Sequence, residues 1–274
     1  MTTDAQQTAG DGPGGQRSQG WRKWHRRRVE TITAPYGPLS LTGTHWLDDH
    51  PQGRIPSVPG SWTADGDEVV LTAVAADGLS LGGEPFTGTA RLAAHHGPIP
   101  ESPVAHGERR LVVLRREGLW AIRDFDPAAP ARTGFAGFEA TPYDPRWALP
   151  GRFRPYPEHR SVRVENADGR ERGLGLAGEI LFSLDGEEYG LHAAVEDDGS
   201  LWAVFADATG GDTSYRFRFL RPGAPAADGT VTVDFNRALL PPCAFAEHFI
   251  CPFPPPGNTL PVAVEAGERI PLGG

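Results

Sequence analysis

The chain has 274 residues, enough for one large or two small β domains whose core needs no disulfide or metal to be stable. Its 26 Lys and Arg against 35 Asp and Glu give a net charge of −9, which argues against nucleic acid and anionic membranes as partners. No long apolar run or charged-then-apolar leader is found, so we expect a cytoplasmic protein without a membrane span.

Glycine and proline are abundant, at 35 and 27 residues, which predicts many turns and few long helices. The first 20 residues are polar and Gly-rich, and they are predicted to form a disordered tail. From Trp21, the sequence WRKWHRRRVETIT places Trp21, Trp24, Arg28 and Ile32 on one helical face. This predicts the one sizeable helix, with the tryptophans packed on the body and the basic residues in solvent rather than on phosphate.

Strand patterns dominate the remainder of the chain, in runs rich in β-branched and aromatic residues. These runs are DEVVLTAVAADG, RRLVVLRREGLWAIRDFD, HRSVRVENADG, GEILFSLDGEEYGLHAAVEDDGSLWAVFAD, TSYRFRFL and GTVTVDFN. Turns at Asp185-Gly186 and Asp198-Gly199 predict a three-stranded meander over residues 178–207. No strand alternates with a helix, so we expect a mainly β fold with antiparallel sheets in a sandwich-like or barrel-like arrangement.

A possible domain boundary lies at residues 126–160, where seven prolines interrupt the strand pattern. We expect two β subdomains, roughly 35–125 and 160–265, on either side of this segment. The corresponding division of the chain is 21–130, which includes the helix, and 131–274. A single continuous barrel fits the pattern as an alternative.

The only Cys/His cluster is Cys243, His248 and Cys251. Three such ligands could hold zinc with an open fourth position. The prolines beside the cysteines favour stiff backbone with buried thiols or a conditional disulfide instead, and a reactive thiol is a further alternative. No cofactor is indicated, because the chain also lacks GxGxxG after a strand, a phosphate-binding GK[ST] loop, GxSxG, HExxH and CxxC.

Polar residues follow the strand VTV near the C-terminus. Alternation along a strand sends Asp234 and Asn236 to one face and Phe235 and Arg237 to the other. The polar pair could belong to a site, but hydrogen-bond anchors for the PPPGN loop are favoured. Asp207 and Thr209 in FADATGG leave the same alternatives open.

His45 could act as a general base if Asp48 or Asp49 orients it. A structural histidine is the favoured interpretation.

Taken together, these motifs resemble the family of domains of unknown function numbered 1684, found in actinobacteria and many other bacteria. The resemblance rests on WRKWHRRRVETITAPYGPLSLTGTHWL, REGLWAIRDFD, FAGFEATPYDPRW, FADATGGDTSY and above all the closing DFNRALLPPCAFAEHFICPFPPPGNTLPVAVEAGE. It covers nearly everything after the tail and implies a mostly β bacterial protein with an N-terminal helix, but no established activity. The chain departs from the family pattern at Leu239 and Leu240, where an aromatic residue and an amide are usual, and in TSYRFRFL, which keeps Tyr215 and Arg218 without the glycines.

Residues 234–258 are predicted to form a rigid wrap that buries Cys243 and Phe245 and returns to a strand at LPVAVEA. The leading functional hypothesis is a small-molecule binding protein with a pocket beside this wrap. The residues assigned to that pocket are Asp234, Asn236, Arg237, Tyr215 and Asn258. One alternative is a hydrolytic or metal-assisted enzyme that uses His248 with the cysteines or His45 with an acidic partner. Another is a protein-interaction module with an exposed apolar patch. The oligomeric state stays open.

Overall fold

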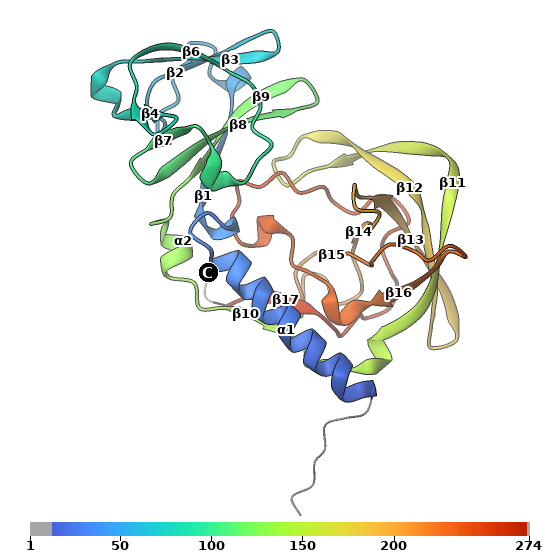
Figure 1. The fold of residues 1–274 in the computed structure, drawn as a ribbon. Coiled ribbons are helices and arrows are strands. Elements are labelled where there is room, and N and C mark those ends of the chain that lie inside the picture. The colour runs from blue at the N-terminus through green and yellow to red at the C-terminus, as the bar shows by residue number, and fades with distance from the viewer. Residues whose placement is uncertain (1–12, 273–274) are drawn as a thin grey trace, which may run out of the picture. The chain divides into compact units, whose positions relative to one another are not determined.

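The computed structural model describes residues 13–272 (Figure 1). The chain divides into two compact units. Unit 1 comprises residues 1–30, 136–244 and 251–274, and unit 2 comprises residues 31–135 and 245–250. The helix therefore belongs with the C-terminal β strands, whereas the sequence placed it with the first β subdomain. None of the helices within residues 13–272 has the length and apolar character needed to cross a membrane.

Helix α1 (Pro13–Thr33) begins earlier than Trp21. The prediction of disorder is wrong for residues 13–20, where Pro13 occupies a position at which helices favour proline; residues 1–12 lie outside the described part. The predicted packing face is confirmed. Trp21 Nε1 donates to the carbonyl of Asn236 at 2.8 Å, Arg28 binds the carboxylate of Glu268, and Ile32 is fully buried.

Unit 2 contains two antiparallel sheets and the short helix α2 (Pro130–Thr133). Its strands are β1 (Leu41–Trp46), β2 (Ser61–Asp65), β3 (Glu68–Ala73), β4 (Leu79–Leu81), β5 (Glu84–Pro85), β6 (Gly88–Leu92), β7 (Val104–His106), β8 (Arg109–Arg116) and β9 (Leu119–Phe125). One sheet has the order β1-β9-β8-β7-β4-β5 and the other the order β2-β3-β6. Their inward apolar side chains, among them Trp62, Leu71 and Ile122, form the core of this unit.

Unit 1 contains the longer strands. They are β10 (Phe138–Ala140), β11 (Ala148–Glu165), β12 (Glu171–Leu184), β13 (Glu187–Val195), β14 (Leu201–Phe205), β15 (Arg218–Leu220), β16 (Thr230–Asp234) and β17 (Glu268–Pro271). The main sheet has the order β15-β14-β13-β12-β11-β16, and β10 pairs with β17. Figure 1 shows that β11 and β12 curve strongly, so the sheet forms an open half-barrel.

The predicted meander is confirmed, since β12, β13 and β14 pair antiparallel in chain order. Asp185 and Gly186 both have positive φ, at 52° and 90°. Positive φ at both central residues is the type I′ turn that suits a two-residue hairpin, so this Asp-Gly pair sets the register of β12 and β13.

The core of unit 1 is centred on Phe235, whose side chain is fully buried. Its ring makes T-shaped contacts with Phe182, Phe205 and Trp147, with centroids 5.4, 5.6 and 6.3 Å away. The predicted strand alternation over residues 234–237 is wrong, because Phe235–Arg237 forms a 3₁₀ turn in which Phe235 and Asn236 are both buried while Arg237 is exposed. The burial of Phe235 fixes where the chain leaves β16.

Two features of unit 1 differ from the sequence-based predictions. Strand β11 begins at Ala148 and continues through the proline-rich segment. Its register against β12 shifts between Pro155 and Arg160, and such an irregularity accommodates residues that cannot donate to the ladder. The predicted strand LPVAVEA is wrong, because residues 260–266 are irregular and β17 begins only at Glu268.

The predicted wrap does bury Cys243 and Phe245. Cys243 belongs to unit 1, whereas Phe245 lies in the segment 245–250 that belongs to unit 2.

Candidate functional site

A buried ion pair holds two chain segments of the candidate site in unit 1. Arg218 Nη2, on β15, is 2.6 Å from Asp207 Oδ2, and the two side chains are 1% and 2% exposed. Burial alone would raise the pKa of Asp207, but the charge of Arg218 and the hydrogen bonds from Thr209 lower it below the ordinary value. Asp207 is therefore held as the carboxylate.

The same two side chains hold two chain segments in place. Asp207 Oδ1 accepts from the amide and hydroxyl of Thr209 at 2.9 and 2.6 Å, and from the amide of Val264 at 3.2 Å. Arg218 donates to the carbonyls of Val264, Ala266 and Glu268. Val264 and Ala266 therefore bond to buried side chains rather than to a neighbouring strand, which explains why this part of LPVAVEA does not form one.

A third segment, residues 141–147, is held by Asn236. Its side-chain oxygen accepts from the amide of Asp144 at 2.9 Å, and its side-chain nitrogen donates to the carbonyl of Asp144, also at 2.9 Å. Asp144 in turn caps the 3₁₀ turn Pro145–Trp147 by accepting from the amide of Arg146.

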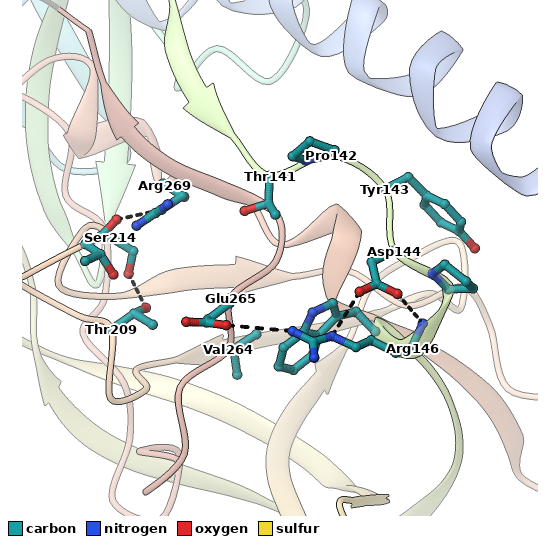
Figure 2. Close-up of a pocket in the computed structure, with 13 residues that line it drawn as sticks. Thr141, Pro142, Tyr143, Asp144, Arg146, Thr209, Ser214, Val264, Glu265 and Arg269 are labelled. Carbon is teal, nitrogen blue, oxygen red and sulfur yellow. Dashed lines mark hydrogen bonds and ion pairs between the residues drawn. The ribbon is translucent and has the colours of Figure 1, made fainter.

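The three segments enclose an open cavity of about 670 Å³ (Figure 2). The lining is polar and aromatic, with hydroxyl groups, two carboxylates and two arginines. It consists of Thr141, Pro142, Tyr143, Asp144, Pro145, Arg146, Trp147, Thr209, Thr213, Ser214, Val264, Glu265 and Arg269.

The two arginines of the cavity differ in their contacts. Arg146 is paired with Asp144 at 2.9 Å and with Glu265 at 3.7 Å, and its guanidinium lies 5.0 Å from the Trp147 ring centroid. Arg269 donates from Nε to the carbonyl of Thr213 at 2.8 Å. Within residues 13–272, its terminal nitrogens have no hydrogen-bond or ion-pair partner. Arg269 is therefore positioned through Nε while its other donors remain available at the cavity wall.

The structure does not bring the five predicted ligand-binding residues together. Asp234 and Arg237 form a loose ion pair at 3.4 Å and line a separate hollow of about 250 Å³. Asn236 and Asn258 are buried, and their amide groups bond to backbone. Tyr215 points its hydroxyl toward Cys243.

The two asparagines act as anchors, with partners that the sequence did not reveal. Asn258 accepts from the amide of His192 and donates to the carbonyls of His192 and Val204, all at 2.8–2.9 Å. Asn258, a residue of the PPPGN loop, thus fixes this loop to β13 and β14. Asn236, which was expected to anchor that loop, binds Asp144 at the cavity instead.

The predicted metal ligands fall in different units, Cys243 and Cys251 in unit 1 and His248 in unit 2. Both cysteines are buried and are not joined by a disulfide. Among the described residues, no group of three or more His, Cys, Asp and Glu side chains is arranged to hold a metal ion.

His45 has a different acidic neighbour from the predicted Asp48 or Asp49. Burial lowers its pKa below the ordinary value, and the charge of Asp124, on the adjacent strand β9, opposes that change. Arg109 donates from Nε and Nη2 to the two carboxylate oxygens of Asp124. Asp124 is therefore already neutralised by a closer partner, which weakens it as an orienting group for His45.

The predicted apolar patch of an interaction module has few candidates in the described part of the chain. The large apolar side chains that are clearly exposed there are Val74, Val195 and Leu272, at 60%, 44% and 38%. They come from three segments far apart in the sequence, and the interaction hypothesis stays a prediction.

Sequence reasoning missed most of the cavity. Asp144 carried a signal, because Asp-Pro in PYDPRW is a typical start of a helical turn. Arg269 and Glu265 carried none, since they stand in a short segment near the C-terminus whose partners lie in distant parts of the sequence.

A model of the family described as "Protein of unknown function (DUF1684)" matches residues 133–269. The match does not extend to the N-terminal blocks that the sequence resemblance also included. Among solved structures, the chain is similar to the solution NMR structure of an uncharacterized protein of Haloarcula marismortui, with 35% identity and a TM-score of 0.43. That alignment covers 52% of this chain and 81% of the other. No curated protein matches the chain.

Proposed function

The chain belongs to the DUF1684 family, whose description assigns no activity, and we propose from the geometry of unit 1 that it binds a small polar molecule carrying a carboxylate or phosphate group. The molecule occupies the cavity of about 670 Å³, with its anionic group at Arg269. The observation that carries the proposal is the guanidinium of Arg269, fixed through Nε with its terminal nitrogens unpartnered within the described residues.

The guanidinium group suits this task because its planar array of donors matches the two oxygens of a carboxylate or phosphate. Holding Nε on the carbonyl of Thr213 removes much of the rotational freedom that a surface arginine would lose on binding. Arg146 is a poorer anion contact, because Asp144 and Glu265 already neutralise it.

The rest of the lining supports a polar ligand body. Ser214 and Thr209 form a hydroxyl pair at 2.7 Å on one wall, and Tyr143 supplies an aromatic surface on another. The carboxylates of Asp144 and Glu265 can accept hydrogen bonds from ligand hydroxyl or amino groups. The volume lies within the range of roughly 300–1,000 Å³ that is typical of small-molecule sites.

The walls of the cavity are held in place by buried side chains of unit 1. The ion pair of Asp207 and Arg218 fixes two of the wall segments, and Asn236 fixes the third. A cavity whose walls are fixed before binding loses less conformational entropy when the ligand enters.

The test is a thermal unfolding screen of the full chain against small carboxylates and phosphate esters, each paired with its uncharged analogue. We expect an anionic compound to raise the unfolding temperature of the wild type while its uncharged analogue does not, since a ligand that binds only the folded state stabilises it. Arg269→Gln should abolish the shift. Arg221→Gln, which changes an exposed arginine outside this cavity, serves as the matched control. Equal shifts in the wild type and Arg269→Gln would overturn the proposal.

A further inference from the structure

The two cysteines of unit 1 form a close thiol pair that is separate from the cavity. The backbone amide of Cys243 donates to Cys251 Sγ at 3.4 Å. The two cysteines are not joined by a disulfide in this structure, and they are only 8% and 5% exposed. Neither residue lines the proposed binding cavity.

Tyr215 and Arg216 bias Cys243 toward the thiolate. The Tyr215 hydroxyl donates to Cys243 Sγ at 3.8 Å. Burial, with the neighbouring Cys243, raises the pKa of Tyr215 to about 12, so the phenol remains a protonated donor at neutral pH. The hydrogen bond with Cys251 lowers the pKa of Cys243, whereas burial raises it. The hydrogen bond from Tyr215 and the positive charge of Arg216 lower this pKa further. These contacts favour the nucleophilic thiolate form of Cys243.

The backbone around both sulfurs is held in place. Cys243 lies in the 3₁₀ turn Pro242–Ala244, where the amide of Ala244 donates to the carbonyl of Pro241 at 2.9 Å. The carbonyl of Cys251 accepts from the amide of Ala167 at 2.8 Å. The proximity of the sulfurs is therefore a built feature of the fold.

We propose that Cys243 and Cys251 form a reversible disulfide when a peroxide oxidises the protein. The Cys243 thiolate attacks one peroxide oxygen, the O–O bond breaks, and Cys243 becomes a sulfenic acid as one water (or alcohol) leaves. The sulfur of Cys251 then attacks the sulfenic sulfur, the S–S bond forms, and the sulfenic oxygen leaves as water with the thiol proton. Two thiols lose two electrons and the peroxide gains them; a dithiol reductant reverses the change.

The position of the pair in the chain gives the disulfide a structural effect. The chain leaves unit 1 after Ala244 and returns to it at Cys251, and residues 245–250 in between belong to unit 2. Oxidation closes a short covalent loop around this excursion. A cross-link of this kind restricts the unfolded chain and raises the unfolding temperature when it fits the native geometry.

The test uses the reduced full-length protein treated with hydrogen peroxide, then alkylated under denaturing conditions and analysed by intact mass and peptide mapping. We expect a loss of about 2 Da, protection of both cysteines from alkylation, a cross-linked peptide joining Cys243 to Cys251, and full reversal by dithiothreitol. Because this readout needs only the wild type, it does not depend on any variant folding. Two thiols that stay alkylatable, overoxidation without a cross-link, or cross-links only between chains would each overturn the proposal.

Variants refine the assignment. Cys251→Ser should stop at a sulfenic acid on Cys243 that dimedone traps, and Tyr215→Phe should slow oxidation by about fivefold to tenfold, the effect of losing one donor to a charged sulfur. Tyr36→Phe, which removes a hydroxyl that donates to the carbonyl of Glu108 and lies outside both the cavity and the thiol pair, is the matched control and should oxidise at the wild-type rate. An unchanged rate in Tyr215→Phe would contradict the role of that hydroxyl.

Discussion

Arg218 Nη2 lies 2.6 Å from Asp207 Oδ2 in the interior of unit 1, and both side chains are almost completely excluded from solvent. The pair bonds to the turn at Thr209 and to the backbone of Val264, on two walls of the proposed binding cavity. A buried ion pair that also bonds to the backbone of two segments fixes their geometry, whatever its net contribution to stability.

Arg218→Met should therefore be strongly destabilising. It leaves the Asp207 carboxylate buried without its partner and removes the donors to three backbone carbonyls. We expect a loss of about 3–5 kcal/mol in the free energy of unfolding, measured by urea denaturation. Arg221→Met, which breaks an exposed ion pair with Glu196, should cost about 1 kcal/mol or less. Similar losses in the two variants would contradict the structural role of the buried pair.

The pH dependence of stability should carry the signature of Asp207. Its pKa is lowered in the folded protein, so the unfolded chain binds the proton more tightly. The stabilisation is complete above the unfolded pKa of roughly 4, and it is lost as the pH falls through the lower folded pKa. The difference in unfolding free energy between the wild type and Asp207→Asn should thus shrink below about pH 4. A difference that stays constant from pH 6 to the acid limit would show that Asp207 is not the group responsible.

The sequence predicted those parts of the fold that local patterns determine. The helical face of Trp21, Arg28 and Ile32 follows from a 3.6-residue period, and the hairpin at Asp185-Gly186 follows from turn chemistry. Strand alternation failed at residues 235–237, because they form a 3₁₀ turn that buries Asn236 as well as Phe235.

The cavity could not be predicted in this way, because its walls come from residues 141–147, 209–214 and 264–269. Only folding brings these segments together. Residues 260–266 were taken for a strand because their composition is that of one. The backbone of Leu260 and Val262 bonds to Ala206 and Ala208, but that of Val264 and Ala266 bonds to the side chains of Asp207 and Arg218. Hydrophobic periodicity in a sequence predicts which residues are buried. It does not predict which side chains form hydrogen bonds with the backbone of an irregular segment.

Asn236→Ala should affect both stability and ligand binding. The variant loses the two hydrogen bonds to Asp144 and leaves buried backbone groups unsatisfied, which should cost about 1–3 kcal/mol. Because residues 141–147 form one wall of the cavity, ligand affinity should fall as well. Calorimetric titration beside denaturation measures both quantities.

Asn258→Ala is the matched control for this experiment. Asn258 is equally buried and its side chain bonds to three backbone groups of His192 and Val204, but none of these residues lines the cavity. We expect a similar loss of stability with unchanged affinity. Equal loss of affinity in both variants would mean that Asn236 acts through global stability and not through the position of Asp144.

The packing of helix α1 on unit 1 should depend on Arg28. Its guanidinium binds the fully buried carboxylate of Glu268 and the carbonyl of Leu240. Arg28→Ala leaves Glu268 without its counter-charge, and we expect a loss of roughly 2–4 kcal/mol in urea denaturation. Arg26→Ala on the exposed side of the helix should change stability by about 0.5 kcal/mol or less. If both variants were neutral, the helix would not be held by this contact.

The central claim is that unit 1 holds a small anionic molecule at Arg269, and native mass spectrometry tests it most directly. The wild type and Arg269→Gln, purified from cells without added ligand, are each compared in native and denatured form. We predict a stoichiometric mass excess that is present in the native wild type, lost on denaturation and absent from Arg269→Gln, and that identifies an acidic molecule. A native wild-type mass equal to that of the bare chain, together with no binding in the anion screen, would contradict the claim.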